Sequence, residues 1–395
     1  MDQDPLLPGR RPFPRAGRIL NTPRRRLCYV VASGMTVQAF LREHIRAAAE
    51  QFDVTVVANA AAADLEGVAA RLIPVPIERR IAPLADLNAL LKLIGIFRRE
   101  RFDLVHSVTP KAGLLAALAG AIAGVPVRMH TFTGQVWATR SGPGRALLKA
   151  LDRLTASLST RVLADSASQR DFLVAEGVVA ADKLQVLGNG SVNGVDSARF
   201  RPDGGARERV RAQATIPPDA VLFLYLGRLA RDKGLLDLAR AFAGVDGAWL
   251  MMVGPDEDGI AGEIRAACGA AAGRLRILDR TTEPERYMAA ADVFVLPSYR
   301  EGFGSVILEA AAASVPAIGT RIYGITDAIV EGKTGFLVPV RDAAALAARM
   351  RELAGDAPLR EEMGRAARAR VLRDFRTEDL TRALLAHHEQ CLLAR

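Results

Sequence analysis

The chain has 395 residues, of which 50% are apolar and 5% aromatic, with a formal net charge of +9 at pH 7. A chain of this length exceeds what one hydrophobic core usually supports, so two domains are expected. The scarcity of aromatic residues and the lack of a recognisable binding motif argue against a nucleic-acid-binding protein.

The first 25 residues predict a basic, flexible tail. Seven arginines and two aspartates among the first 26 residues carry more than half of the net charge. Prolines punctuate this segment, and it lacks the uninterrupted apolar core of a signal peptide. It either touches anionic lipid or is a solvated extension.

Alternating apolar runs and helical segments then predict a first α/β domain over residues 26–195. The run Leu27–Ala32 reads as a strand, Ser33-Gly34-Met35 as a turn, and Val37–Glu50 as a helix. Repetition of this pattern predicts a parallel sheet with helices on both faces. Gly34 would face a cleft between domains and touch a ligand there, although an ordinary tight turn explains it equally well.

The segment Ala112–Val127 comes nearest to a transmembrane span. It is rich in alanine, short, and ended by Gly124-Val-Pro126. No stretch of eighteen apolar residues is free of charges and breaks, so we expect a buried helix here, after a turn at Lys111.

Gly, Pro and Asp cluster between residues 193 and 205, after the apolar strand Leu184–Leu187. This composition predicts a linker. We therefore expect a second α/β domain over residues 196–370 and a closing helical segment over 371–395.

The first motif of the second domain is a strand, turn and helix that carries two cations. The apolar run Val221–Leu226 leads through Arg228 and Lys233 to a helical stretch, Leu235–Phe242. Both cations would stand at the carboxyl edge of the sheet, where open α/β sheets bind ligands. A guanidinium and an ammonium can together stabilise a departing nucleotide diphosphate without a metal. The alternative is a pair of surface cations beside a turn.

The second motif joins the strand Val293–Leu296 to a helix that starts at Ser305, through a glycine-rich turn. The backbone N–H groups of Gly302, Phe303 and Gly304 would meet a diphosphate at the positive helix terminus, beside Ser305. Glu301 could reach a hexose, and Glu309 could accept both hydroxyls of a ribose. Alternatively, Glu301 caps the helix and Glu309 is solvated.

Together these motifs resemble those of the retaining glycosyltransferases of family 4, whose GT-B fold has two Rossmann-like domains facing a cleft. Gly188–Asp196 with Arg199-Phe200 resembles the interdomain junction of that family, and Gly324–Asp327 and Gly335–Pro339 follow its order. The resemblance covers roughly residues 25–380. It implies that the closing helix packs back toward the N-terminal domain.

The resemblance implies transfer of a sugar from an NDP-sugar, expected to be UDP-linked, with retention. Arg228, Lys233 and Glu301 would be catalytic, Glu309 would bind ribose, and the base would rest near Arg280–Glu283. No residue is a convincing nucleophile, so we expect the nucleotide to depart from the face that the acceptor attacks. No cofactor and no metal are expected, and Asp256-Glu-Asp258 is predicted to be a surface loop.

Val105–Gly113 and His130–Trp137 resemble the branch of the family that extends lipid-linked sugars for O-antigen, capsule or other glycan precursors. Lys111, His130 and Thr133 are therefore candidates on the acceptor or donor-sugar side. Many relatives have a histidine in a Thr-x-His-Gly pattern where this chain has Thr133. On a strand, His130 and Thr133 face opposite sides, so His130 is either a structural histidine or needs the strand to end between them.

Three cysteines without metal-ligand spacing fit a cytoplasmic protein with reduced thiols. A polyprenyl-linked acceptor would bring the enzyme to the inner face of the cell membrane. The segment Trp137–Arg153 offers aromatic, apolar and basic residues for that surface; otherwise it is a cleft-side loop and a helix with basic residues in water.

Three other classes compete with a transferase. An NDP-sugar epimerase would need further acid and base groups, which are not identified here. A noncatalytic nucleotide-sugar-binding protein would not need Arg228, Lys233 and Glu301 together. A dinucleotide dehydrogenase is disfavoured because the Gly-x-Gly-x-x-Gly fingerprint is absent after the first strand.

Overall fold

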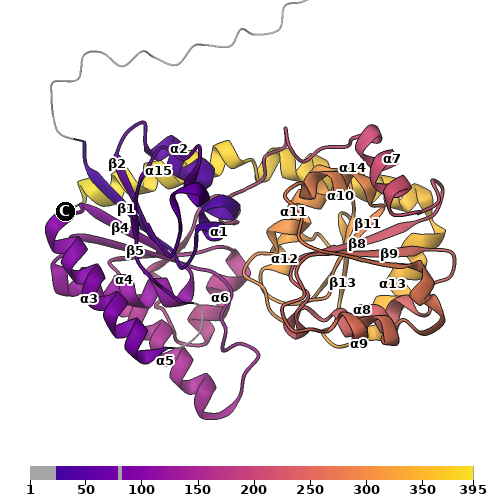
Figure 1. Ribbon diagram of the computed structural model, residues 1–395, viewed down its shortest axis with the longest axis horizontal. Helices are drawn as coiled ribbons and strands as arrows, with labels where there is room; N and C mark the ends of the chain where they lie inside the picture. Colours follow the sequence, from indigo (N-terminus) through magenta and orange to yellow (C-terminus); the bar gives the residue numbers. More distant parts are fainter. Residues whose placement is uncertain (1–23, 79–81, 395) are drawn as a thin grey trace, which may run out of the picture.

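The computed structural model describes residues 24–78 and 82–394. Two α/β domains lie side by side, and the C-terminal helices run along both of them (Figure 1). The predicted basic tail falls almost wholly outside the described residues. Along the described part of the chain, no helix combines the length and the apolar character that crossing a membrane requires.

The first domain is built on a parallel sheet of seven strands, in the order β3-β2-β1-β4-β5-β6-β7. Its strands are β1 (Arg26–Val30), β2 (Asp53–Ala58), β3 (Arg71–Pro74), β4 (Leu104–Val108), β5 (Val127–Phe132), β6 (Arg161–Ala164) and β7 (Leu184–Val186). Its helices are α1 (Gly34–Thr36), the π-helical η1 (Val37–Leu41), α2 (Arg42–Ala48), η2 (Ala62–Leu65), α3 (Pro83–Glu100), α4 (Pro110–Ala123), α5 (Gly142–Leu158) and α6 (Ala167–Ala175). The central strand β4 is buried at every position because helices cover both faces.

The second domain repeats the design with six parallel strands, in the order β10-β9-β8-β11-β12-β13. The strands are β8 (Leu222–Leu226), β9 (Trp249–Val253), β10 (Leu275–Leu278), β11 (Val293–Leu296), β12 (Ala317–Thr320) and β13 (Gly335–Val338). The helices are α7 (Gly204–Gln213), η3 (Arg231–Lys233), α8 (Leu235–Phe242), α9 (Ala261–Ala267), η4 (Gly269–Arg274), α10 (Pro284–Ala290), α11 (Ser305–Ala312), α12 (Ile325–Ala328), α13 (Ala343–Gly355), α14 (Ala357–Asp374) and α15 (Thr377–Leu393).

In each sheet the strand order reverses beside the first strand of the domain, between β1 and β4 and between β8 and β11. Ligands of open α/β sheets bind outside the carboxyl ends of the strands at such reversal points. This confirms the predicted α/β class with two doubly wound parallel sheets. It also places the turns after β8 and β11 side by side.

The last helix, α15, belongs to the core of the first domain although it follows the second in sequence. Leu384, Leu385, Cys391 and Leu392 are buried in the same apolar cluster as β1 and β2. The chain therefore passes between the domains twice. The two passages are hydrogen-bonded to each other, because Val195 N donates to Phe375 O at 2.8 Å and Thr377 N to Val195 O at 3.2 Å.

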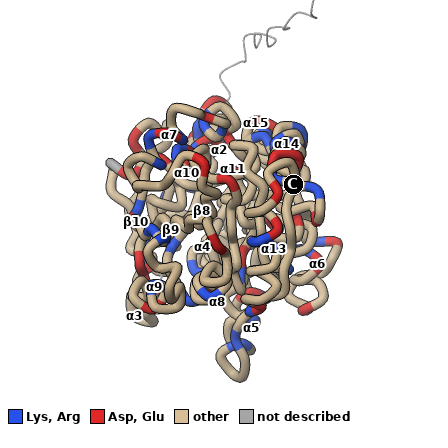
Figure 2. Tube along the Cα trace, turned by 90° about the vertical axis from the view of Figure 1, so that its right-hand side faces the viewer, with Lys and Arg blue, Asp and Glu red and all other residues tan. Residues whose placement is uncertain are grey.

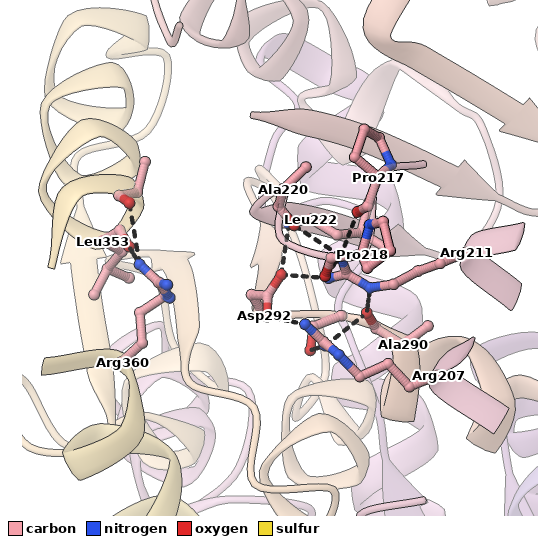
Figure 3. Close-up of polar contacts among 12 residues, drawn as sticks. Arg207, Arg211, Pro217, Pro218, Ala220, Leu222, Ala290, Asp292, Leu353 and Arg360 are labelled. Atoms are coloured by element: carbon pink, nitrogen blue, oxygen red, sulfur yellow. Dashed lines mark hydrogen bonds and ion pairs between the residues drawn. The ribbon is translucent and has the colours of Figure 1, made fainter. Parts of the chain in front are cut away.

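A buried arginine of α7 holds this helix against the segment between α10 and β11 (Figure 3). The Arg211 side chain is 3% exposed and pairs with Asp292 at 2.5 Å. It also donates hydrogen bonds to the carbonyl oxygens of Ala290, Pro217, Pro218 and Ala220. Arg207 reaches the other oxygen of Asp292 at 2.7 Å, so the first helix after the linker is held rigidly.

The predicted turn at Gly34 is wrong. Gly34 is the first residue of α1, and the helix predicted over Val37–Glu50 starts there, continues as a π-helical segment and ends at Ala48. The glycine is needed for another reason: a Cβ at position 34 would lie 2.5 Å from the Cβ of Asp64. Close packing, and not a turn, excludes a side chain at this position.

Basic and acidic residues are interspersed over the face that Figure 2 presents. No continuous basic stripe runs across the described residues seen there. That distribution gives no support to nucleic-acid binding.

Candidate active site between the domains

The turns after β8 and β11 bring the predicted Lys233 and Glu301 into contact. Lys233 Nζ lies 2.5 Å from Glu301 Oε1, and their side chains are only 13% and 16% exposed. Ser298 Oγ donates to the same carboxylate oxygen at 2.7 Å. Glu301 is therefore held in one orientation at the carboxyl edge of the second sheet.

Arg228 stands in the turn directly after β8. Its guanidinium pairs with the carboxylate of Glu257, and its carbonyl accepts a hydrogen bond from the Tyr225 hydroxyl at 2.7 Å. One third of the Arg228 side chain is exposed. Glu257 thus fixes a cation of the site, a role that nothing in the sequence indicated.

The side chains on either side of Glu257, Asp256 and Asp258, accept hydrogen bonds from backbone N–H groups. Asp256 accepts hydrogen bonds from the N–H groups of Ile260 and Ala261, and Asp258 accepts one from Arg231 N at 2.8 Å. Among residues 24–78 and 82–394, no group of three His, Cys, Asp or Glu side chains is arranged to hold a metal ion.

The glycine-rich turn connects β11 to α11, and its geometry suits the binding of an anion. Gly304 has a positive φ of 72° and precedes the first helical residue, Ser305. The N–H groups of a first helical turn have no partners within the helix, so they can bind an anion. The Phe303 side chain is buried, with its ring 5.7 Å from that of Phe375, so only its backbone can serve a ligand.

Glu309 lies further along α11 and is half-buried. Burial raises the pKa of its carboxyl group to about 7, although Arg199 lowers this pKa while Glu285 raises it. Its backbone carbonyl accepts a hydrogen bond from Ala313 N, but no hydrogen bond or ion pair joins its carboxylate to another residue of the described chain. The carboxylate is thus an acceptor that a ligand could use.

The first domain touches the donor turn, which we define as Glu301–Gly304, through the loop after β5. A Cβ at Gly134 would lie 2.9 Å from the carbonyl carbon of Glu301 and from Gly302 N. The preceding residue, Thr133, is fixed because its carbonyl accepts a hydrogen bond from Gln169 Nε2 at 2.6 Å. The structure therefore brings Thr133 and Gly134 next to the predicted sugar site.

Lys111 and His130 are not brought to the donor turn. Lys111 Nζ pairs with Asp86 of α3 at 2.6 Å. His130 is 1% exposed, and its ring fills the space that a Cβ at Gly113 would need. Its Nδ1 lies 2.9 Å from Ser107 Oγ, and burial lowers its pKa to about 4. β5 ends at Phe132, between His130 and Thr133, but the imidazole still packs inside the first domain. The structural role weighed for His130 therefore agrees with its burial, and a place beside the donor turn does not.

Asp165, at the end of β6, faces the donor turn from the first domain and was not singled out from the sequence. It is 2% exposed, and its Oδ1 has no hydrogen-bond partner. A Cβ at Gly302 would lie 2.5 Å from its Oδ2. One aspartate after an apolar run gives no signal that separates it from other strand-end carboxylates.

Further contacts hold the domains together beside this site. Ser168 Oγ accepts a hydrogen bond from Gly324 N at 2.8 Å and donates one to the Asp327 carboxylate. The rings of Phe172 and Tyr323 stack across the interface with centroids 4.5 Å apart. The cleft is therefore closed in this structure.

Comparison with known proteins agrees with this architecture. Residues 35–190 match the family described as glycosyl transferase 4-like domain, and residues 206–370 match glycosyl transferases group 1. The capsular polysaccharide biosynthesis glycosyltransferase CapM of Staphylococcus aureus is 31% identical over 309 residues, which cover 77% of this chain and 81% of the relative. This chain belongs to glycosyltransferase family 4.

A second relative of this family 4 glycosyltransferase is the UDP-Gal:alpha-D-GlcNAc-diphosphoundecaprenol alpha-1,3-galactosyltransferase of Escherichia coli. It is 26% identical over 309 residues, which cover 74% of this chain and 78% of the relative. Among solved structures, HepE of Anabaena in complex with UDP and glucose matches with a TM-score of 0.78 at 18% identity, covering 93% of this chain and all of that one.

The lipopolysaccharide glycosyltransferase WaaG matches with a TM-score of 0.73 at 19% identity, covering 91% of this chain and 98% of that chain. At such identities the structures show the fold, which is GT-B. The predicted family, the GT-B fold and the assignment as a glycosyltransferase are thereby confirmed.

Proposed function

We propose that this family 4 glycosyltransferase transfers a hexosyl group from a UDP-sugar to a glycan or polyprenyl-linked sugar in cell-surface polysaccharide synthesis, with retention at the anomeric carbon. The observation that carries the proposal is the Lys233–Glu301 ion pair at the reversal point of the second sheet, directly opposite Gly134. The names of the capsular relative and of the galactosyltransferase support this donor and acceptor class.

In this proposal, the diphosphate lies against the N–H groups of Gly302–Gly304, with Arg228 and Lys233 beside it. Glu301 accepts hydrogen bonds from hydroxyls of the donor sugar, and Glu309 accepts them from the ribose. The base rests near Arg280–Glu283. Lys233 is already oriented by Glu301 before substrate arrives, so little rearrangement is needed when the diphosphate replaces the carboxylate as its partner.

The chemical step breaks the bond between the anomeric carbon and the diphosphate oxygen, which keeps the electron pair. The acceptor hydroxyl attacks the same face of the sugar, and its proton passes to the leaving phosphate. Arg228 and Lys233 neutralise the charge that develops on the diphosphate. Domain closure excludes water that would otherwise hydrolyse the donor. No group of the enzyme needs to bond to the sugar.

The test is a screen of the full chain against UDP-hexoses and UDP-N-acetylhexosamines, with polyprenyl-diphosphate sugars as acceptors. We expect a product one sugar heavier by mass spectrometry, with the anomeric configuration of the donor by NMR. Conversion of the donor to another UDP-sugar without acceptor would point to an epimerase. Binding of UDP-sugar with no turnover on any acceptor would point to a noncatalytic protein.

The proposal includes a membrane surface, but the Trp137 indole and two basic side chains of the predicted segment Trp137–Arg153 are engaged within the protein. Trp137 is 1% exposed and donates a hydrogen bond to Asp152 at 2.7 Å. Arg145 and Lys149 both pair with Glu176, at 2.8 and 2.5 Å. These side chains hold α5 against α6, so neither they nor the indole can serve a lipid surface.

The outer face of α3 is better suited to a bilayer. Leu84, Leu87 and Leu91 form a stripe along it and are 85%, 53% and 61% exposed. Its exposed charged side chains are basic, namely Lys92, Arg98 and Arg99. Its two acidic residues, Asp86 and Glu100, are only partly exposed and are paired with Lys111 and Arg71. An apolar stripe with positive flanks is attracted to anionic lipid.

The position of α3 suits a lipid-linked acceptor. It begins at the carboxyl edge of the first sheet, where the cleft opens, and lies on the outer side of the first domain (Figure 1). We expect the full chain to sediment with vesicles that contain phosphatidylglycerol and not with phosphatidylcholine alone. Serine at Leu84, Leu87 and Leu91 together should abolish this, whereas Leu372→Ser, on exposed α14, should not. Equal sedimentation of the two variants would contradict the assignment.

A further inference from the structure

We propose that Asp165 is a positioning residue for the transfer reaction: with a proton on its carboxyl group the first domain seats on the donor turn, and without that proton the two domains separate. The inference rests on the proposed function, because it concerns the closure of the same cleft over the donor.

The backbone of Asp165 is fixed while its carboxyl group is left without a partner. Its N–H donates to Gln169 Oε1 at 3.0 Å, and its carbonyl accepts from Ser191 N at 2.6 Å. These bonds leave the side chain little freedom. The Oδ1 atom is buried with no hydrogen bond, an arrangement that folded proteins rarely keep without a reason.

One glycine, Gly302, lies against the carboxyl group, and further glycines allow close backbone contacts around it, within the second domain and between the domains. A Cβ at Gly302 would lie 2.5 Å from Asp165 Oδ2 and 2.9 Å from Gly134 N. A Cβ at Gly190 would lie 2.7 Å from Asp165 O, and one at Gly324 would lie 1.8 Å from Gly302 O. We name these four residues, Gly134, Gly190, Gly302 and Gly324, the glycine seam. Because Asp165 belongs to the first domain and Gly302 to the second, the Asp165 carboxyl group contacts the donor turn only when the domains are closed.

The charged groups that face Asp165 are acidic. From the donor turn comes Glu301, and from α12 comes Asp327; Tyr323 also lies near. The nearest residues of its own domain, Ser166 and Gln169, are neutral. The cations of the neighbourhood are engaged elsewhere: Lys233 pairs with Glu301, Arg300 with Asp232, and Arg370 donates to the Asp327 carbonyl.

This environment favours the neutral acid. Burial, followed by the charges of Asp327 and Glu301, holds the pKa of Asp165 well above its usual range. Loss of the proton in the closed form would leave an unpaired carboxylate beside two others, away from water. Separation of the domains relieves this repulsion, because Gly302 then moves away and water reaches the carboxylate.

Closure and proton binding are therefore coupled. A diphosphate in the cleft adds negative charge near Asp165, so donor binding should favour the protonated, closed form further. Release of the proton then accompanies opening, when the nucleotide leaves. Because lids that close over substrate set turnover in many enzymes, the charge on Asp165 should appear in the pH dependence of turnover.

The test compares wild type with Asp165→Asn, which keeps the shape but cannot ionise. The radius of gyration by small-angle X-ray scattering is measured from pH 6 to pH 10, with and without UDP. We expect the wild type to expand as the pH rises, and UDP to shift this expansion to higher pH. Asp165→Asn should stay compact at every pH. Asp171→Asn, on the exposed side of α6, is the matched control and should behave as wild type.

A second variant keeps the test decisive if Asp165→Asn folds poorly. Gly302→Ala places a methyl group against the carboxyl oxygen, so it should hold the domains apart at every pH. A wild type whose radius is constant to pH 10, an Asp165→Asn protein that expands like wild type, or a compact Gly302→Ala protein would overturn the inference. Scattering needs no turnover, so a failure to find a glycosyl acceptor would weaken the proposed function and leave this result standing.

Discussion

At the scale of single residues, Glu309 has a carboxyl group whose pKa is raised and whose oxygen atoms accept no hydrogen bond from another described residue. Burial raises its pKa to about 7, so its carboxyl group titrates close to neutral pH. Ribose hydroxyls donate hydrogen bonds, so they favour the ionised carboxylate. In the proposed role of Glu309 as the ribose acceptor, nucleotide binding and loss of this proton are therefore linked.

We expect the affinity for UDP to rise as the pH rises from 6 to 8, by up to roughly tenfold, because the ionised fraction of Glu309 rises over this interval. Isothermal titration calorimetry measures this directly. Glu309→Gln should bind UDP more weakly and show a flatter pH dependence. The phosphate of UDP titrates equally in both proteins, so identical slopes for the two would rule Glu309 out as the ribose acceptor.

Arg228 and Lys233 are expected to act chiefly on turnover. In the proposed mechanism, replacing either by methionine removes a cation that faces the departing diphosphate, and losses of this kind lower kcat by about 100-fold to 1,000-fold. Arg228→Met should change the melting temperature little, whereas Lys233→Met leaves the mostly buried Glu301 carboxylate without its cation and should also lower the melting temperature. Arg240→Met is a suitable control, since Arg240 is 61% exposed on α8 and outside the site. Turnover near the wild-type rate in both site variants would contradict their assigned role.

Sequence reasoning found these cations because strand, turn and helix signals fix which residues reach the sheet edge. It missed Glu257 and Asp165 because their significance depends on partners distant in sequence: Glu257 meets Arg228 across 29 residues, and Asp165 meets Gly302 across the domain boundary. It placed His130 ambiguously because the end of β5 decides which way that ring points, and a pattern of apolar residues locates strand ends poorly.

At the scale of elements, the two domains can close only because the positions of the glycine seam carry no side chains. Gly134→Ala adds a Cβ only 2.9 Å from the backbone of Glu301 and Gly302. We expect this variant to fold but to close incompletely, with kcat/KM reduced at least tenfold, because small misplacements of reacting groups are costly.

A matched control is Gly95→Ala on exposed α3, where nothing lies within 4 Å of the new methyl group. There, alanine should stabilise the protein by about 1 kcal/mol and leave turnover unchanged. Kinetics and urea unfolding separate the two effects. Full activity in Gly134→Ala would mean that the seam need not close for transfer.

Arg211 of α7 is expected to contribute strongly to the free energy of unfolding of the second domain. Its replacement by methionine leaves Asp292 and several buried carbonyl groups without this partner, and breaking a buried pair usually costs about 3–5 kcal/mol. Urea unfolding measures this difference. Arg349→Ala removes a pair with Glu352 that is 41% exposed on both sides, and should change stability by no more than about 1 kcal/mol.

Element boundaries followed the sequence most closely where the apolar period is unbroken. The predicted bounds of α8 and β11 agree with the structure residue for residue. The segment after β1 was mispredicted because a glycine between a strand and a helix reads as a turn. Only the position of Asp64, brought close by the fold, reveals why that glycine is needed.

At the scale of the whole molecule, the histidines make the protein sensitive to acid. All five are buried, and burial is the main cause that lowers the pKa of each: His44, His106, His130, His387 and His388. The pKa of His388 falls to about 3, and its Nε2 lies 3.1 Å from His106 Nδ1 of β4. The docking of α15 therefore depends on neutral imidazoles.

Unfolded histidine has a pKa of about 6.5, so below that pH the unfolded chain binds protons that the folded chain does not. Stability is complete above pH 6.5 and should fall on acidification toward pH 4, by up to about 1.4 kcal/mol per histidine and pH unit. Urea midpoints at pH 7.5, 6.0 and 5.0 measure the loss. His388→Gln should show a shallower decline, and a wild-type midpoint that stays constant to pH 5 would contradict the account.

The return of α15 to the first domain has a consequence for biosynthesis. The ribosome makes the first domain before the second, yet four apolar side chains that complete the core of the first domain belong to α15, which follows the second domain in the chain. The half that is translated first is thus the one that finishes folding last. A nascent chain that stops short of α15 would carry an open apolar groove, which makes it a substrate for chaperones or proteases instead of a half-active enzyme.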